Sequence, residues 1–179
     1  MITRCKKILR RFRKEEDGAI YLIEFVILMP LIFGIFIMSW DMSLYSLRQV
    51  HLDRGLDQAV RHIRLNTRQN ITHDQIKTMI CQGSGYVGDC QNTLRLEMVK
   101  VNPRSFATMN PDIDCIDKSL PVTQERGFSL GKQHDLMLLR ACLKFDPLIA
   151  STGFGFNYIV DGQGQAAMYA ISAFVQEPS

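Results

Sequence analysis

The 179-residue sequence predicts an α+β protein: an N-terminal transmembrane helix continues into an amphipathic helix, which packs on a small antiparallel sheet. Three observations predict this fold. One apolar run has membrane-spanning length, a one-sided apolar pattern follows it directly, and alternating residues recur in the C-terminal half. The expected parts are a basic leader (residues 1–19), a transmembrane helix (20–40) and an extracytoplasmic α+β domain (41–179).

The apolar run from Ala19 to Trp40 has 22 residues, with one carboxylate, Glu24, and no basic residue. A helix of this length crosses the roughly 30 Å hydrocarbon layer once. A secretory signal peptide is the competing interpretation, but its apolar core spans about 7–15 residues and precedes small residues at a cleavage site. The run is longer and ends in Met38-Ser39-Trp40, so we favour an anchor. Trp40 suits the membrane surface, and Asp41 is expected to mark the exit into water.

Charge is divided unevenly along the chain. The first 17 residues carry seven basic and three acidic side chains, and the remainder carries 14 basic and 15 acidic ones. A basic leader before a membrane span holds the N-terminus in the cytoplasm and sends the C-terminal part outward. Beyond the leader, no basic patch interleaves with aromatic residues, so nucleic acid is not an expected partner.

Two helices are expected at the start of the outer domain. The first continues the membrane helix without a break to about Leu65, with apolar residues at spacings of three, four and seven on one face. These residues are Tyr45, Leu52, Leu56, Ala59, Val60 and Ile63. The polar stretch 66–70 ends this helix. Thr72 then caps a second helix whose apolar residues Ile76, Met79 and Ile80 lie on one face, and Gly83-Ser84-Gly85 stops it.

Three strand candidates follow, at Thr93–Val101, Leu136–Phe145 and Ala167–Val175. The first alternates apolar and polar residues before Asn102-Pro103, as a half-buried strand does. The segments between the candidates, Arg104–His134 and Asp146–Gln165, are rich in turn residues and predict loops. The amphipathic helix is therefore expected to pack on an antiparallel sheet of three or four strands.

Four of the five cysteines, Cys81, Cys90, Cys115 and Cys142, lie beyond the apolar run, and Cys5 lies in the leader. An even set in an oxidising compartment predicts two disulfides, with three connectivities open to the sequence. Cys81 with Cys90 closes a short glycine-rich loop and is the preferred local bridge, which leaves Cys115 with Cys142. Buried free thiols are the alternative; a zinc site is disfavoured because no CxxC pair exists and the histidines are scattered.

Catalytic motifs are missing from the sequence: it contains no GxSxG, HExxH or Walker-type loop. The acidic run Asp112–Asp117 lacks the glycine and terminal glutamate of an EF-hand loop, so a solvated loop is favoured over a calcium site. The glycines between Thr152 and Gly164 have no adjoining strand-to-helix fingerprint and predict turns, not a phosphate cradle. We therefore expect neither an enzyme nor a cofactor, metal or small-molecule substrate.

The first 30 residues carry a more specific pattern. A basic leader, the small residues Gly18 and Ala19, a short apolar stretch and then Glu24-Phe25 resemble the prepilin processing signal of type IV pilins. With Pro30 six residues after Glu24, the segment is similar to the TadE/TadF pseudopilins of tight-adherence (Flp) pilus systems. The likeness is close over residues 18–30 and loose over the rest of the chain.

The position of Glu24 departs from the family pattern by one residue. Pilins carry this glutamate at the fifth mature position, and here five residues separate it from Gly18. Cleavage after Ala19, starting the mature chain at Ile20, keeps the glutamate fifth. Cleavage after Gly18 moves it to sixth. We favour the first register, because the resemblance implies that the glutamate meets a new N-terminal amine at a fixed distance.

The resemblance implies a pseudopilin or minor pilin-like component of Tad pilus assembly. Its expected partners are the bacterial inner membrane, a prepilin peptidase and other Tad pilins or pseudopilins, with the outer domain in the periplasm. Glu24 and Pro30 would act in assembly, Glu24 by accepting the amine of a neighbouring subunit. The alternative is an uncleaved single-pass protein whose disulfide-bonded ectodomain binds a ligand or a surface.

Overall fold

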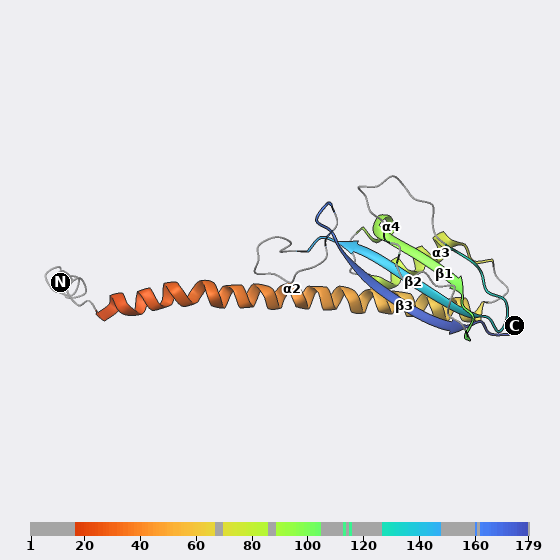
Figure 1. The fold of residues 1–179 in the computed structure, drawn as a ribbon, viewed down its shortest axis with the longest axis horizontal. Helices are drawn as coiled ribbons and strands as arrows, with labels where there is room; N and C mark the ends of the chain where they lie inside the picture. Colours follow the sequence, from red (N-terminus) through yellow and green to blue (C-terminus); the bar gives the residue numbers. More distant parts are fainter. Residues whose placement is uncertain are drawn as a thin grey trace, which may run out of the picture. The chain divides into compact units, whose positions relative to one another are not determined.

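The computed structural model describes residues 17–66, 70–85, 89–104, 113, 115, 127–147, 160 and 162–178. The chain divides into two units, Met1–Trp40 and Asp41–Ser179. The described elements are α2 (Asp17–Leu65), α3 (His73–Ser84), α4 (Cys90–Thr93), β1 (Leu94–Lys100), β2 (Leu136–Phe145) and β3 (Ala166–Val175) (Figure 1). The protein is thus α+β, with a long apolar N-terminal helix and a small antiparallel sheet.

Helix α2 is continuous over 49 residues, through Pro30, and supplies residues to both units. Its part in the second unit buries one face, at the spacing that the sequence predicts. The residues on this face are at most 7% exposed: Leu52, Leu56, Ala59, Val60 and Ile63. They join the strands in one hydrophobic cluster, which confirms that the amphipathic helix packs on the sheet.

Helix α3 begins and ends where the sequence predicts. Thr72 Oγ1 accepts a hydrogen bond from the Gln75 amide, and the Gln75 side chain accepts one from the Thr72 amide, which forms a capping box. The helix ends at Ser84, and Gly85 follows with a φ of 42°. Ile76 and Ile80 are fully buried.

Close packing of α3 against α2 depends on two glycines. A methyl group on Gly55 would lie 2.5 Å from the Ile80 carbonyl oxygen, and one on Gly83 would lie 3.0 Å from Gly55 Cα. The first distance is shorter than real Cβ atoms show, and the second is tighter than nine in ten of their contacts. The two helices therefore approach this closely only because neither position carries a Cβ atom.

The sheet has the order β1-β2-β3 with both pairs antiparallel. The strand candidates were correct in number for the described residues, and β2 matches its expected bounds. A short segment adds to the free edge of β1: the Met98 amide donates to the Gly127 carbonyl (3.0 Å), and the Ser129 amide donates to the Met98 carbonyl (2.9 Å). The sequence predicts a loop here, because a single bridged pair, Met98 and Phe128, is too short to produce an alternating pattern.

Candidate functional site

The expected processing residues lie at the start of α2. Gly18, Ala19 and Ile20 belong to its backbone, and their side chains lie outside the described residues, as does the leader itself. Glu24 and Phe25 follow on the same helix, and both side chains are exposed. Glu24 lies just over one helical turn after Ile20, which is about 6 Å along the helix axis at about 1.5 Å of rise per residue.

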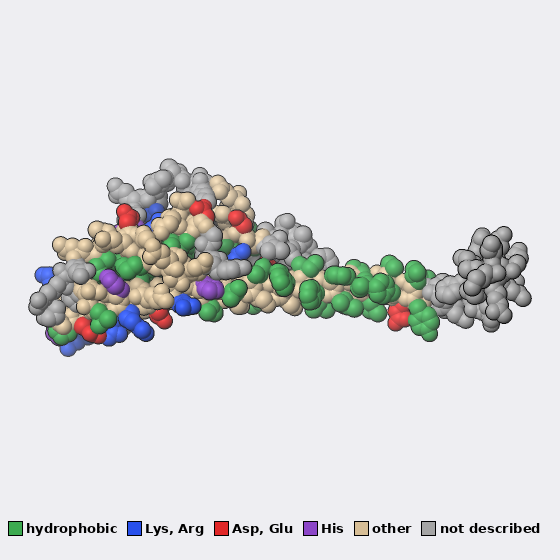
Figure 2. Space-filling model, turned by 180° about the vertical axis from the view of Figure 1, so that it is seen from behind, with side chains coloured by type: hydrophobic (Ala, Val, Ile, Leu, Met, Phe, Trp, Pro, Cys, Tyr) green, Lys and Arg blue, Asp and Glu red, His purple; other side chains and the backbone are tan. Residues whose placement is uncertain are grey.

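Large apolar side chains stay exposed along the first unit. From Tyr21 to Trp40 their exposed fractions reach 73%, and hydrophobic side chains cover the visible face of this stretch in Figure 2. Those between 42% and 73% exposed are Tyr21, Leu22, Ile23, Phe25, Val26, Ile27, Leu28, Leu31, Ile32, Phe33, Ile35, Phe36, Ile37 and Trp40. Among the described residues, α2 is the one helix long and apolar enough to cross a membrane. This composition suggests membrane association.

Glu24 is the one carboxylate on this apolar surface. Its side chain makes no hydrogen bond or ion pair with any residue that the structure describes. An acidic side chain near the centre of a membrane helix costs about 2.5–3.5 kcal/mol, and less near the interface. Pro30 lies on the exposed surface of the same helix.

Asp41 corrects the expected exit into water. Its side chain is 5% exposed, and its Oδ2 atom has no hydrogen-bond partner within the described part of the chain. The residue is the first of the second unit, so it belongs to the folded domain and not to a solvated junction. The sequence pattern misleads here because a carboxylate after an apolar run is normally solvated.

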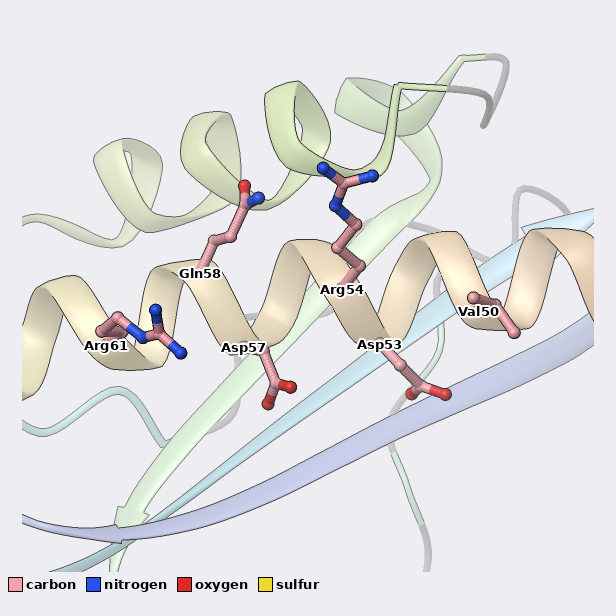
Figure 3. A pocket seen from close by; sticks show the side chains of 6 residues that line it. All are labelled: Val50, Asp53, Arg54, Asp57, Gln58 and Arg61. Atoms are coloured by element: carbon pink, nitrogen blue, oxygen red, sulfur yellow. The ribbon is translucent and has the colours of Figure 1, made fainter.

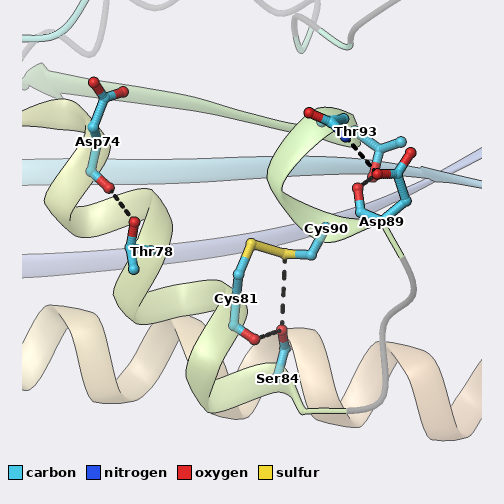
Figure 4. Close-up of a disulfide and its surroundings, with 8 residues drawn as sticks. Asp74, Thr78, Cys81, Ser84, Asp89, Cys90 and Thr93 are labelled. Carbon is cyan, nitrogen blue, oxygen red and sulfur yellow. Dashed lines mark hydrogen bonds between the residues drawn. A yellow bond between two sulfur atoms is a disulfide. The ribbon is translucent and has the colours of Figure 1, made fainter.

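The four outer cysteines form two disulfides in the preferred pairing. Cys81 bonds to Cys90 with 5.7 Å between their Cα atoms, and Cys115 bonds to Cys142 with 5.3 Å. The first bridge joins the last turn of α3 to the start of α4, beside the Ser84 hydroxyl, which donates to the Cys81 carbonyl at 3.1 Å (Figure 4). Both bridges lie in the second unit and stabilise it mainly by constraining the unfolded chain.

Buried charged side chains lie on one face of β1 and β2, and the sequence does not predict their burial. Arg95, Arg140 and Lys144 are between 4% and 9% exposed, although their strands alternate as if one face met water. Arg140 Nη2 donates to Glu97 Oε2 at 2.6 Å across the paired strands, and both side chains are at most 12% exposed. Cys142, which carries the second disulfide, lies two residues after Arg140 on the same face. The only sequence signal was the placement of a cysteine between two cations.

Asp135 forms a second ion pair, at the start of β2. Its Oδ1 accepts a hydrogen bond from Lys100 Nζ at 2.6 Å, and its Oδ2 accepts one from the Lys132 amide at 2.9 Å. The Lys100 hydrogen bond, then the backbone hydrogen bond, hold the pKa of Asp135 below its ordinary value. Asp135 and Lys100 line a depression of about 460 Å³ with Val101, Asn102, Pro103, His134 and Leu136.

Among the described residues, no group of three or more His, Cys, Asp or Glu side chains is placed to hold a metal ion. Most of the acidic run Asp112–Asp117 lies outside the described residues, and so do Thr152, Gly153 and Gly155. Gly162 and Gly164 lie in a turn before β3.

No protein-family model, curated protein or solved structure matches this chain.

Proposed function

We propose that this chain is a non-enzymatic pseudopilin, or minor pilin-like component, of a Tad (Flp) type IV pilus in a bacterial inner membrane. The observation that supports it most directly is Glu24: an exposed carboxylate, without a partner in the described chain, within the stretch of α2 from Tyr21 to Trp40 that exposes large apolar side chains. A plain anchor gains nothing from that carboxylate. A subunit that assembles through it gains a registering contact.

The proposed mechanism begins with the leader. Its seven basic residues keep the N-terminus in the cytoplasm, and a prepilin peptidase removes it, with the cut after Ala19 favoured over the cut after Gly18. The cut creates a charged amine. The amine of one subunit then lies near Glu24 of its neighbour and offsets the cost of that carboxylate in lipid, while the apolar surface of α2 provides the helix packing.

N-terminal sequencing and intact mass of the protein from its native membrane test the proposal. A mature chain that starts at Ile20 or Ala19 supports it. A chain that still starts at Met1 overturns it and leaves the uncleaved single-pass protein with a binding ectodomain. The same measurement in a strain that lacks the prepilin peptidase identifies the enzyme that cuts. The chain should keep the mass of the uncut protein in that strain and have the lower mass of the cut protein in the parent strain.

Glu24→Ala tests the assembly step separately. We expect normal membrane insertion and normal leader removal, with pilus formation lost or strongly reduced, because the carboxylate is needed after the cut. Ile23→Ala, one residue away on the same exposed surface, is the matched control and should leave assembly near wild type. Pili that form normally with Glu24→Ala would contradict the assigned role.

A further inference from the structure

Between Val50 and Arg61, the exposed surface of α2 sorts its charges into two flanks. Figure 3 shows Asp53 and Asp57 pointing to one side of the helix and Arg54 and Gln58 to the other. At 100° per residue, the two aspartates lie about 20° and 60° to one side of Val50, and Arg61 and Arg54 about 20° and 40° to the other. One helix thus presents an acidic flank and a basic flank side by side.

These four charged side chains are exposed, and none makes an ion pair with another described residue. Asp53 accepts only weak hydrogen bonds from Gln49 Nε2, at 3.3 and 3.4 Å. Asp57 and Arg61 are four residues apart, a spacing that commonly allows a pair within one helix, yet they do not form one. Their charges are therefore available to another molecule.

Apolar side chains continue this surface toward the first unit. Val50 is 63% exposed and Leu47 43% exposed, although both lie beyond the predicted end of the membrane span at Trp40. The six residues that line the shallow depression on this face include two carboxylates and two guanidinium groups: Val50, Asp53, Arg54, Asp57, Gln58 and Arg61. Such a balanced surface favours neither a strongly acidic nor a strongly basic partner.

We propose that the partner on this surface is a second copy of the same chain, lying alongside in parallel, with the acidic flank of one α2 against the basic flank of the next. Copies anchored in one membrane are parallel, which places flanks of opposite charge together when the helices lie side by side. Asp57 lies between Arg54 and Arg61 along the axis, so an offset of about 4.5–6 Å brings it level with either one.

The two flanks are different surfaces, so the contact is heterologous: each copy uses one flank for each neighbour. A contact of this kind repeats into a ring or an open filament instead of closing as a dimer. The charges set register and orientation more than affinity, which the apolar part of α2 would provide. This inference rests on the proposed function only in requiring several copies of the chain in one membrane.

Paired charge reversals test the contact in membranes that contain the full chain. Asp53→Lys/Asp57→Lys makes both flanks basic, and Arg54→Glu/Arg61→Glu makes both acidic. Each variant alone should lose cross-linking between copies by on the order of tenfold, and coexpression of the two should restore it, because both kinds of neighbouring contact are again between opposite charges. Asp74→Lys, at an aspartate whose side chain is 94% exposed on α3, is the matched control.

Reporter cysteines give a second readout that leaves the charges intact. Ser46→Cys lies on the acidic flank and Leu47→Cys on the basic flank, and both are tested in a Cys5→Ser background with separately tagged chains. The heterologous contact predicts cross-links between a Ser46→Cys chain and a Leu47→Cys chain in clear excess over either chain with itself. Cross-links between like positions alone, or none, would overturn the proposal, as would charge reversals that change nothing or are not rescued by coexpression.

The N-terminus of the cross-linked chains is read in the same samples. Correct processing without flank-to-flank cross-links overturns this inference alone. Retention of Met1 with the predicted cross-links overturns the pseudopilin proposal and keeps the contact between copies.

Discussion

Gly55→Ala is the substitution whose effect follows most directly from the structure. Two contributions oppose each other. Alanine has a higher helix propensity than glycine by about 0.8–1 kcal/mol, which alone would stabilise α2. The added Cβ atom, however, would lie 2.5 Å from the Ile80 carbonyl oxygen, 3.1 Å from the Ser84 amide nitrogen and 3.3 Å from the Ile80 carbonyl carbon. All three atoms belong to the backbone, so a change of side-chain rotamer cannot relieve the clash.

Relief requires α3 to move away from α2 by more than half an ångström, which would loosen Ile76 and Ile80 in the core. Overpacking of this kind costs about 1–3 kcal/mol. We expect the steric cost to exceed the propensity gain, with a net loss of about 1–2 kcal/mol in the free energy of unfolding. Gly83→Ala should cost less, since its nearest neighbour is the flexible Gln58 side chain at 2.6 Å.

Thermal or denaturant unfolding of the detergent-solubilised full chain, with intact disulfides, measures both variants by near-ultraviolet circular dichroism. The double variant should lose more than the sum of the single variants, because the two glycines face each other and neither helix can then make room. A Gly55→Ala protein as stable as wild type, or more stable, would refute the steric argument. It would show that α2 and α3 can move apart here with little loss of stability.

Three further predictions concern the ion pairs and the disulfides. Glu97→Gln should destabilise the fold by on the order of 3 kcal/mol because it removes the charge of the carboxylate that the buried Arg140 contacts at 2.6 Å. Glu177→Gln should cost at most about 1 kcal/mol, since the Arg64–Glu177 pair has the same 2.6 Å distance but is 47% and 44% exposed; equal losses in urea titrations would contradict the burial argument. Asp135 has a lowered pKa in the folded state, so its ionised form contributes stability above its ordinary pKa of 3.8, and that contribution is lost as the pH falls through the lowered folded value. Lys100→Met should shrink this acid-range loss in unfolding curves between pH 2 and 5, and an unchanged profile would exclude the pair as its source. Replacing Cys115 and Cys142 by alanine should cost about 3.5 kcal/mol and replacing Cys81 and Cys90 about 2.6 kcal/mol by loop-entropy reasoning, because their separations are 27 and 9 residues; the reverse order in unfolding experiments would mean that native packing around the bridges outweighs loop closure.

The helices and most of the sheet could be predicted because their signals are local. The Thr72 capping box, the glycines after Ser84 and the one-sided apolar spacing of α2 each act within a few residues. The Met98–Phe128 bridge and the four-residue helix α4 are too short to show a periodic apolar pattern, so neither could be predicted from the sequence. The pairing of the cysteines was preferred on loop length alone, and the structure agrees with it.

Buried charges could not be predicted, because their environment comes from distant parts of the chain. The alternation in β1 and β2 places Arg95, Arg140 and Lys144 on the face that normally meets water. The structure gives nine of the ten β2 positions as buried, so both faces of this central strand are covered. Arg140 then depends on Glu97, 43 residues earlier, which reaches it only because the antiparallel register sets the two residues opposite each other.

The two units differ in whether their apolar side chains are buried within the chain. In the second unit, α2, α3 and the sheet share one cluster of buried apolar side chains, so this unit has a hydrophobic core of its own. The apolar half of α2 has no such cluster: none of the 18 residues in its most apolar stretch is buried. Lipid alone would satisfy those side chains, but lipid does not satisfy Glu24. Under the proposed function, neighbouring helices with free N-terminal amines would supply both an apolar surface and a positive charge near the start of the helix. The state of the N-terminus is therefore the measurement that tests this explanation.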